Sequence, residues 1–125
     1  MLNPGFAEAH YNLGCLLLQT RQIPAAKAEF EQVFRQNPDH SGANNNLATI
    51  LAQAGQYREA VAHYTRALRT APADEEIYAN RAFANYRLGR LADAIKDYEQ
   101  ALRIRPTFTD AKKNLELLRA QTRPL

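Results

Sequence analysis

The sequence has one cysteine, no tryptophan and only five glycines among its 125 residues. Because a single thiol, Cys15, cannot form an internal disulfide, the composition is typical of a reducing compartment, and we expect a cytoplasmic location. The glycines are scattered and form no phosphate-binding loop. The three histidines share no metal-ligand spacing with one another or with Cys15. The sequence therefore predicts that the protein is not an enzyme and that it binds no metal ion or cofactor.

Long apolar stretches are also missing. The longest uninterrupted apolar run is Cys15–Leu18, whereas a membrane-spanning helix needs about 18 apolar residues. Near the N-terminus, Asn3, Pro4 and Glu8 interrupt the apolar region that a secretory signal peptide would require. We therefore expect no membrane association.

Neither sign of charge is in large excess, since Lys and Arg number 16 and Asp and Glu number 13. A net charge of +3 with interleaved acids makes nucleic acid an unlikely main partner. Hydrophobic residues make up 46% and charged residues 23% of the chain, which is a globular composition. The length suits one domain of ordinary size.

Several kinds of residue recur every 34 positions. Such columns at one fixed period indicate tandem structural repeats. They are the prolines Pro4, Pro38, Pro72 and Pro106, the alanines Ala26, Ala60 and Ala94, the aromatics Phe30, Tyr64 and Tyr98, and the small residues Gly14, Ala48 and Ala82.

Each repeat is predicted to form two helices. In the second repeat, Ser41 can cap a helix that runs to about Ala54, and Gly55 supplies the left-handed residue that ends it. A second helix, with apolar residues at i, i+3 and i+4 spacing, follows and ends at Pro72. In the first repeat Arg21 replaces the turn glycine.

This helix–turn–helix pattern resembles the tetratricopeptide repeat (TPR) family, which implies an all-α, right-handed helical-repeat solenoid. Residues 2–6 have the form of a repeat's last five residues, so we favour a chain cut from a longer array over a naturally short one beginning at Met1. The expected segments are 1–6 as the end of a preceding repeat or an N-terminal extension, TPR units at 7–40, 41–74 and 75–108, a capping helix at 109–120 and a tail at 121–125.

The chain departs from the family pattern at four positions. His10 and Asn44 stand where the family often has a large residue, and Arg81 and Asn85 replace leucines of the other units. These departures predict either polar groups with partners or looser packing.

A fifth column consists of asparagines: Asn12, Asn46, Asn80 and Asn114. Asparagine is a poor helix former, so its recurrence within helices needs a reason. The family resemblance places this column on the concave face, where an amide can match the N–H and C=O groups of an extended peptide. Similar ladders in O-GlcNAc transferase TPR superhelices imply peptide capture. Alternatively, the amides bond neighbouring helices and fix the stacking of the repeats.

The same register places further residues in the groove, with Tyr11, Phe83 and Tyr86 as apolar anchors. The others that we expect to contact a peptide are Cys15, Asn45, Thr49 and Arg87. TPR domains that bind chaperone tails grip a terminal carboxylate through lysine, asparagine and arginine. The corresponding positions here are Tyr11, Cys15, Asn46, Glu76 and Asn80, of which only Asn46 matches. The resemblance therefore implies that this chain does not bind the C-terminal carboxylate of a heat-shock chaperone.

These observations predict a protein–protein interaction module, a scaffold or adaptor that binds a segment of a protein partner in its concave groove. One alternative is self-assembly into a homo-oligomer through stacked repeats. Another is RNA binding, which the strict 34-residue period and the scarcity of groove cations disfavour.

Overall fold

The computed structural model describes residues 4–123, and within them the chain forms seven helices and no strand. None of these helices is both long and apolar enough to cross a membrane. Their bounds are α1 Pro4–Gln19, α2 Ile23–Gln36, α3 Ser41–Gln53, α4 Tyr57–Thr70, α5 Glu75–Arg87, α6 Leu91–Ile104 and α7 Thr109–Thr122.

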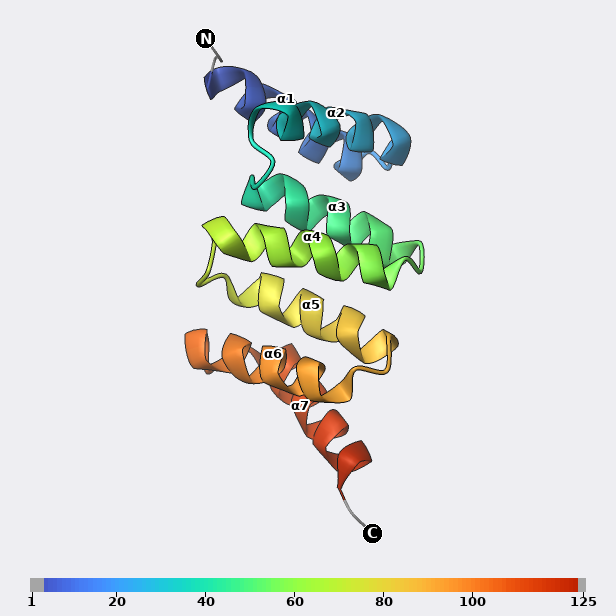
Figure 1. The fold of residues 1–125 in the computed structure, drawn as a ribbon, viewed down its shortest axis with the longest axis vertical. Coiled ribbons are helices and arrows are strands. Elements are labelled where there is room, and N and C mark those ends of the chain that lie inside the picture. The colour runs from blue at the N-terminus through green and yellow to red at the C-terminus, as the bar shows by residue number, and fades with distance from the viewer. Residues whose placement is uncertain (1–3, 124–125) are drawn as a thin grey trace.

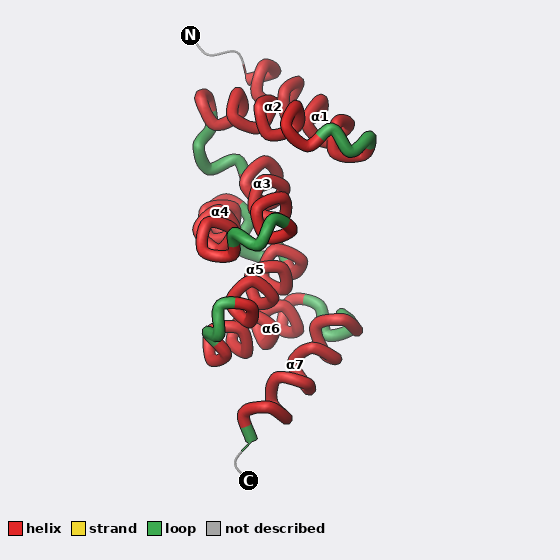
Figure 2. Tube along the Cα trace, turned by 90° about the vertical axis from the view of Figure 1, so that its right-hand side faces the viewer, coloured by secondary structure: helices red, strands yellow, loops and turns green. Residues whose placement is uncertain are grey.

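The helices form an elongated stack in chain order (Figure 1). Helices α1 to α6 lie across the long axis as three antiparallel pairs, and α7 leaves the stack obliquely at the far end (Figures 1 and 2). Each pair packs against the next, and α3 also contacts α1 and α5. The first helices of successive pairs therefore follow one another along the solenoid. The predicted all-α repeat fold is confirmed.

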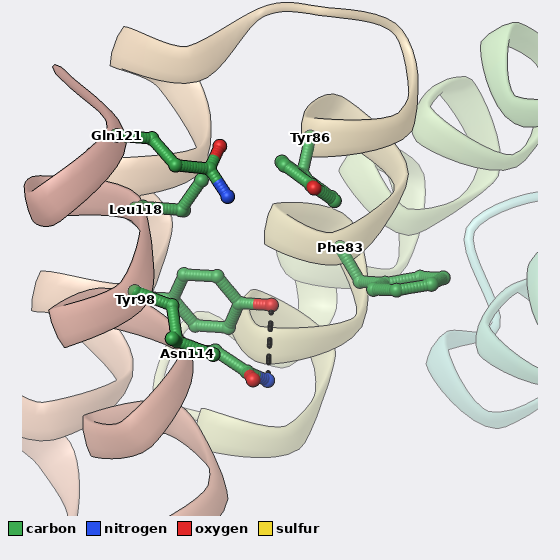
Figure 3. A pocket seen from close by; sticks show the side chains of 7 residues that line it. Phe83, Tyr86, Tyr98, Asn114, Leu118 and Gln121 are labelled. Carbon is green, nitrogen blue, oxygen red and sulfur yellow. Dashed lines mark hydrogen bonds between the residues drawn. The ribbon is translucent and has the colours of Figure 1, made fainter.

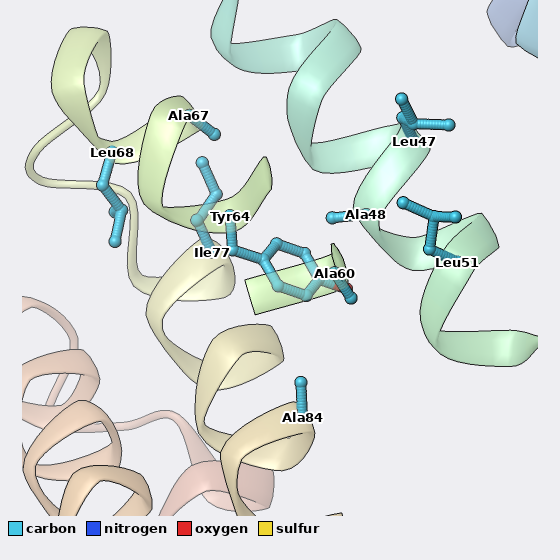
Figure 4. Packing of buried hydrophobic residues seen from close by; sticks show 9 residues of the cluster. All are labelled: Leu47, Ala48, Leu51, Ala60, Tyr64, Ala67, Leu68, Ile77 and Ala84. Carbon is cyan, nitrogen blue, oxygen red and sulfur yellow. The ribbon is translucent and has the colours of Figure 1, made fainter. Parts of the chain in front are cut away.

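Two columns of residues build the contact within each pair. The alanines Ala26, Ala60 and Ala94 are fully buried, and the aromatics Phe30, Tyr64 and Tyr98 are nearly so (Figure 4 shows the pair around Tyr64). An alanine lets two helix backbones approach closely, and the aromatic ring fills the space beside it.

Three helix boundaries differ from the sequence-based expectation. Helix α3 is capped by His40 rather than Ser41, because the Ala43 N–H donates to His40 Nδ1 at 3.1 Å. Helix α1 begins at Pro4 instead of near Ala7, since proline is well tolerated in a first helical turn. Residues 1–3 of the expected N-terminal segment lie outside the described residues. Helix α7 continues through Thr122, two residues beyond the expected 109–120.

The three turns within the pairs use the same left-handed conformation. Gly55 and Gly89 have φ of 80° and 79°, as their positions predict, and Arg21 occupies the equivalent turn with φ of 60°. Because a left-handed residue with a Cβ is strained by roughly 1–2 kcal/mol, the first turn is the least favourable of the three.

We predict that Arg21→Gly raises the free energy of unfolding by about 1 kcal/mol, because glycine adopts this conformation without steric cost. Urea denaturation followed by circular dichroism measures the change. The control is Arg21→Ala, which removes the guanidinium but keeps the Cβ and should bring no gain. Equal stability of the parent and the glycine variant would mean that Arg21 is not strained.

The polar departures from the family pattern have partners. Asn44 is fully buried; its amide donates to the carbonyls of Pro38 and His40 at 2.9 and 3.0 Å, and its Oδ1 lies 2.9 Å from Nδ1 of His63. Burial lowers the pKa of His63, so the neutral ring donates its Nδ1 proton to the amide oxygen. His10 Nδ1 forms a hydrogen bond with the carboxylate of Glu29, which joins α1 to α2.

In the third pair, Asp97 brings the other two departures together. Arg81 donates two hydrogen bonds to the Asp97 carboxylate at 2.9 and 2.7 Å, and Asn85 donates a third at 3.2 Å. Asp97 and Asn85 are buried. A bidentate hydrogen bond between a guanidinium and a carboxylate is among the stronger polar interactions in proteins. These residues therefore join α5 to α6 firmly.

We predict that Asp97→Ala lowers the free energy of unfolding by about 3 kcal/mol, because it leaves a mostly buried guanidinium and a buried amide without their acceptor. Asp93→Ala, at an exposed carboxylate of the same helix, should cost under about 1 kcal/mol. Chemical denaturation of both variants makes the comparison. Similar losses in the two would contradict the role of Asp97.

Candidate functional site

The asparagine column lies on the first helices of the pairs and on α7. Asn12 is exposed on α1, whereas Asn46 on α3, Asn80 on α5 and Asn114 on α7 are half-buried. Because α3 contacts both α1 and α5 and each of Asn46, Asn80 and Asn114 lines one of three adjoining hollows, these three asparagines follow one side of the solenoid.

Three hollows follow one another along this side, and each contains one asparagine of the column. The N-terminal hollow, about 480 Å³, is lined by Leu18, Arg21, Ile23, Asn46, Thr49, Ile50 and Gln53. The central hollow, about 280 Å³, is lined by Thr49, Ala52, Gln53, Tyr57, Tyr64, Asn80 and Phe83. The C-terminal hollow, about 130 Å³, is lined by Phe83, Tyr86, Tyr98, Asn114, Leu117, Leu118 and Gln121.

Neighbouring hollows share their walls. Thr49 and Gln53 line both the N-terminal and the central hollow, and Phe83 lines both the central and the C-terminal hollow. The three hollows therefore form one continuous row, which we call the groove. Thr49 and Phe83 are themselves one repeat apart, so the 34-residue period of the sequence produces one hollow after another.

Three of the four amides of the column donate a hydrogen bond to an earlier helix. Asn46 donates to Cys15 Sγ at 3.4 Å, Asn80 to Asn45 Oδ1 at 3.3 Å and Asn114 to the Tyr98 hydroxyl at 3.4 Å. This geometry favours a role in repeat stacking. The two bonds to oxygen are longer than the usual 2.9–3.0 Å, and each amide carries a second N–H and an acceptor oxygen. The same side chains therefore have capacity for a ligand.

Tyr11 packs between helices. Its ring lies against Gly42, where an added Cβ would come within 2.6 Å of the ring. The centres of the Tyr11 and His40 rings are 4.7 Å apart. Burial, together with the nearby Cys15 and Glu8, raises the pKa of Tyr11 to about 12. Neither Tyr11 nor Cys15 lines one of the three hollows. In this structure Tyr11 joins α1 to α3. Its role as an apolar anchor for a peptide stays a prediction.

The other predicted groove residues lie in or beside the row. Thr49, Phe83 and Tyr86 line hollows, and Asn45 accepts the hydrogen bond from Asn80. Arg87 lies beside the central hollow, with its guanidinium carbon 5.5 Å from the centre of the Tyr57 ring, a favourable cation–aromatic contact.

Sequence reasoning missed the tyrosines of the second helices, which it assigned to packing alone. Tyr64 lines the central hollow, with its hydroxyl 2.9 Å from Thr49 Oγ1, and Tyr98 lines the C-terminal hollow beside Asn114 (Figure 3). Burial raises the pKa of both hydroxyls, so both stay neutral, and the Tyr98 hydroxyl accepts the hydrogen bond from Asn114. The signal was the tyrosine itself, because a buried hydroxyl needs a partner.

Charge is scarce in the groove. Among the residues that line the three hollows, all of them described in the structure, Arg21 is the only charged one. The lining otherwise combines amides, hydroxyls, aromatic rings and aliphatic side chains. Such a surface can accept backbone hydrogen bonds and apolar side chains, and it offers little to a highly charged ligand.

Three known structures illustrate the likeness in fold. The first TPR domain of Spaghetti (RPAP3), bound to the HSP90 peptide SRMEEVD, has a TM-score of 0.89 at 18% identity, with 96% of this chain and 95% of that chain covered. MamA from Desulfovibrio magneticus RS-1 has a TM-score of 0.82 at 22% identity, covering 92% of this chain and 65% of that one. A Thermobaculum terrenum O-GlcNAc transferase mutant has 0.84 at 20% identity, covering 95% of this chain and 23% of that one. At these identities the likeness shows the fold.

No curated protein sequence matches the chain. A family model described as tetratricopeptide repeat matches it twice, at residues 11–75 and 46–107. These matches together span most of the chain and coincide with the helix pairs, the left-handed turns and the Ala and aromatic columns described above. The protein belongs to the tetratricopeptide repeat family.

Proposed function

We propose that the protein is an interaction module that holds an extended or helical segment of a protein partner along the groove. The observation that supports this most directly is the row of three connected hollows, each with one asparagine amide. An amide offers both a donor and an acceptor to a peptide backbone, so a row of them can hold a segment without reading every side chain.

The energetics favour such a partner. The hydrogen bonds from Asn80 to Asn45 and from Asn114 to Tyr98 are longer than usual, so rearranging them for a ligand costs little. The helices that carry the amides are held by a packed core, so the groove is largely formed before binding, which limits the entropic cost of association. A single lining cation, Arg21, gives little attraction for the phosphates of RNA.

We predict that changing Asn46, Asn80 and Asn114 together to alanine weakens peptide binding at least about tenfold, because each lost amide removes hydrogen bonds worth about 1 kcal/mol. A random-peptide library is selected on the parent and on the variant, and enriched peptides are measured by fluorescence polarisation. The control is Asn37→Ala, an exposed asparagine in the loop between α2 and α3. Circular dichroism verifies that every variant folds.

If the folded triple variant binds the same peptides as tightly as the parent, the asparagines are stacking residues only. If the parent enriches no peptide, the groove itself is not a peptide site.

We also predict that the peptide SRMEEVD, seen bound to the similar Spaghetti (RPAP3) domain, binds this chain at least a hundredfold more weakly than a library-selected peptide. Three of the positions that correspond to a carboxylate clamp hold Tyr11, Cys15 and the exposed acid Glu76. Tyr11 is packed against Gly42. An acid facing an acidic peptide is repulsive. Polarisation of the labelled peptide measures the affinity, and comparable affinities would refute the prediction.

A second candidate function is self-assembly, favoured by one surface. Leu13 and Leu16 of α1 are 43% and 56% exposed, whereas their counterparts one repeat later, Leu47 and Ile50, are each 8% exposed. In the second repeat these columns are covered by the preceding helix pair. The outer face of α1 therefore has the composition of a helix–helix interface and can bind another copy.

If copies associate through this face, the double variant Leu13→Lys and Leu16→Lys shifts the protein to monomer, because it places charges at the contact. Sedimentation equilibrium over a wide concentration range measures the mass. A parent that stays monomeric at every concentration would refute this candidate. An oligomer that persists in the variant would place the contact elsewhere.

A further inference from the structure

We propose that the C-terminal hollow is a specificity pocket for one bulky apolar side chain, of leucine, isoleucine, methionine or phenylalanine, and that the bound segment carries an acidic residue toward the α1 end of the groove. The proposal rests on the proposed peptide-binding function. It adds which residue the groove reads and in which direction the segment lies.

The size of the hollow suits a single side chain. Its volume is about 130 Å³, well below the roughly 300–1,000 Å³ of pockets that bury a whole small molecule. An apolar cavity of about 150 Å³ holds one benzene molecule. The hollow therefore matches an aromatic ring or a branched aliphatic side chain in volume, and it is too small for a metabolite.

The lining is apolar below and exposed at the rim. Tyr98 and Leu118 are buried beneath the opening, and Figure 3 shows them between α5 and α7 with Tyr86 facing them. Phe83 on α5 and Leu117 on α7 are 46% and 58% exposed, and Figure 3 shows the Phe83 ring turned away from Tyr98 and Asn114. Large apolar side chains left in water are costly, and an apolar residue seated beside Leu117 would bury part of it.

The polar groups of this hollow suit the backbone of the same residue. Asn114 donates one N–H to the Tyr98 hydroxyl at 3.4 Å and retains its second N–H and its carbonyl oxygen. The Gln121 side chain extends toward the opening from the same helix (Figure 3). A residue that inserts its side chain would therefore bring its own N–H and C=O beside these two amides.

The other hollows differ at equivalent positions, and the difference sets the direction. One repeat before Phe83 and Tyr86 stand Thr49 and Ala52, so the central hollow has fewer apolar walls. The N-terminal hollow is the largest of the three, at about 480 Å³, and contains Arg21, the only charged residue that lines them. Charge complementarity places an acidic residue of the segment there, and the apolar residue at the α7 end.

The test uses peptides enriched from a random library on the parent protein. We expect them to share one bulky apolar residue at a fixed position, with acidic residues on one side of it. Leu117→Gln should weaken such a peptide about tenfold, the effect of losing most of one apolar contact. The control is Lys112→Gln, at an exposed residue of the same helix that lines none of the three hollows, and it should leave the affinity unchanged.

A double-mutant cycle then assigns the contact. Replacing the shared apolar residue of the peptide by alanine should weaken binding to the parent about tenfold and binding to the Leu117→Gln variant by less than twofold, because the two changes remove the same contact. Likewise, removing the acidic residue should affect the parent but not an Arg21→Gln variant.

Full additivity in the first cycle, or enriched peptides without a shared apolar residue, would overturn the pocket while leaving the groove proposal intact. Additivity in the second cycle would overturn the assigned direction. Failure of the parent to enrich any peptide would overturn the groove proposal and this inference together.

Discussion

The packing of one aromatic ring between small residues is the contact on which the rest of this solenoid depends. Phe30 lies so close to α1 that a Cβ on Gly14 would come within 2.6 Å of its ring, and Tyr64 and Tyr98 share buried clusters with Ala48 and Ala82. The ring sets the separation of the helices in each pair. In the second and third pairs its hydroxyl also reaches the groove, where it bonds Thr49 or Asn114. In these two pairs, core and groove therefore share one residue.

Periodicity carried the sequence-based prediction far, because the repeat obliges equivalent residues to adopt equivalent positions. The helix pairs, the left-handed glycines and the side on which the asparagines lie all follow from it. The failures occur where contacts depend on a particular pair of residues. His40 rather than Ser41 caps α3, and Asp97 satisfies Arg81 and Asn85 across a helix pair. No single repeat position predicts such a pair; the two positions would have to be considered together.

The asparagine column shows how stacking and recognition can use the same side chains. Asn46, Asn80 and Asn114 each donate one hydrogen bond to an earlier helix, and this bond fixes the orientation of the amide. The remaining polar atoms of each amide are then held beside a hollow. A binding group whose rotamer is already fixed loses less entropy when a ligand arrives. The two interpretations of the column that the sequence left open are therefore compatible, and the stacking bond prepares the amide for the proposed binding role.

The two ends of the solenoid are chemically different, and this asymmetry follows from the same repeat. Helix α7 covers the last pair with Ala111, Leu115 and Leu118 and presents charged residues outward, including Arg119, which pairs with Glu99 of α6 at 2.8 Å. Helix α1 instead presents Leu13 and Leu16 outward. A charged outer helix resists further stacking, whereas an apolar one favours it. Stacking of a second copy would therefore favour the α1 end, and a segment bound as proposed would meet the most apolar hollow at the α7 end.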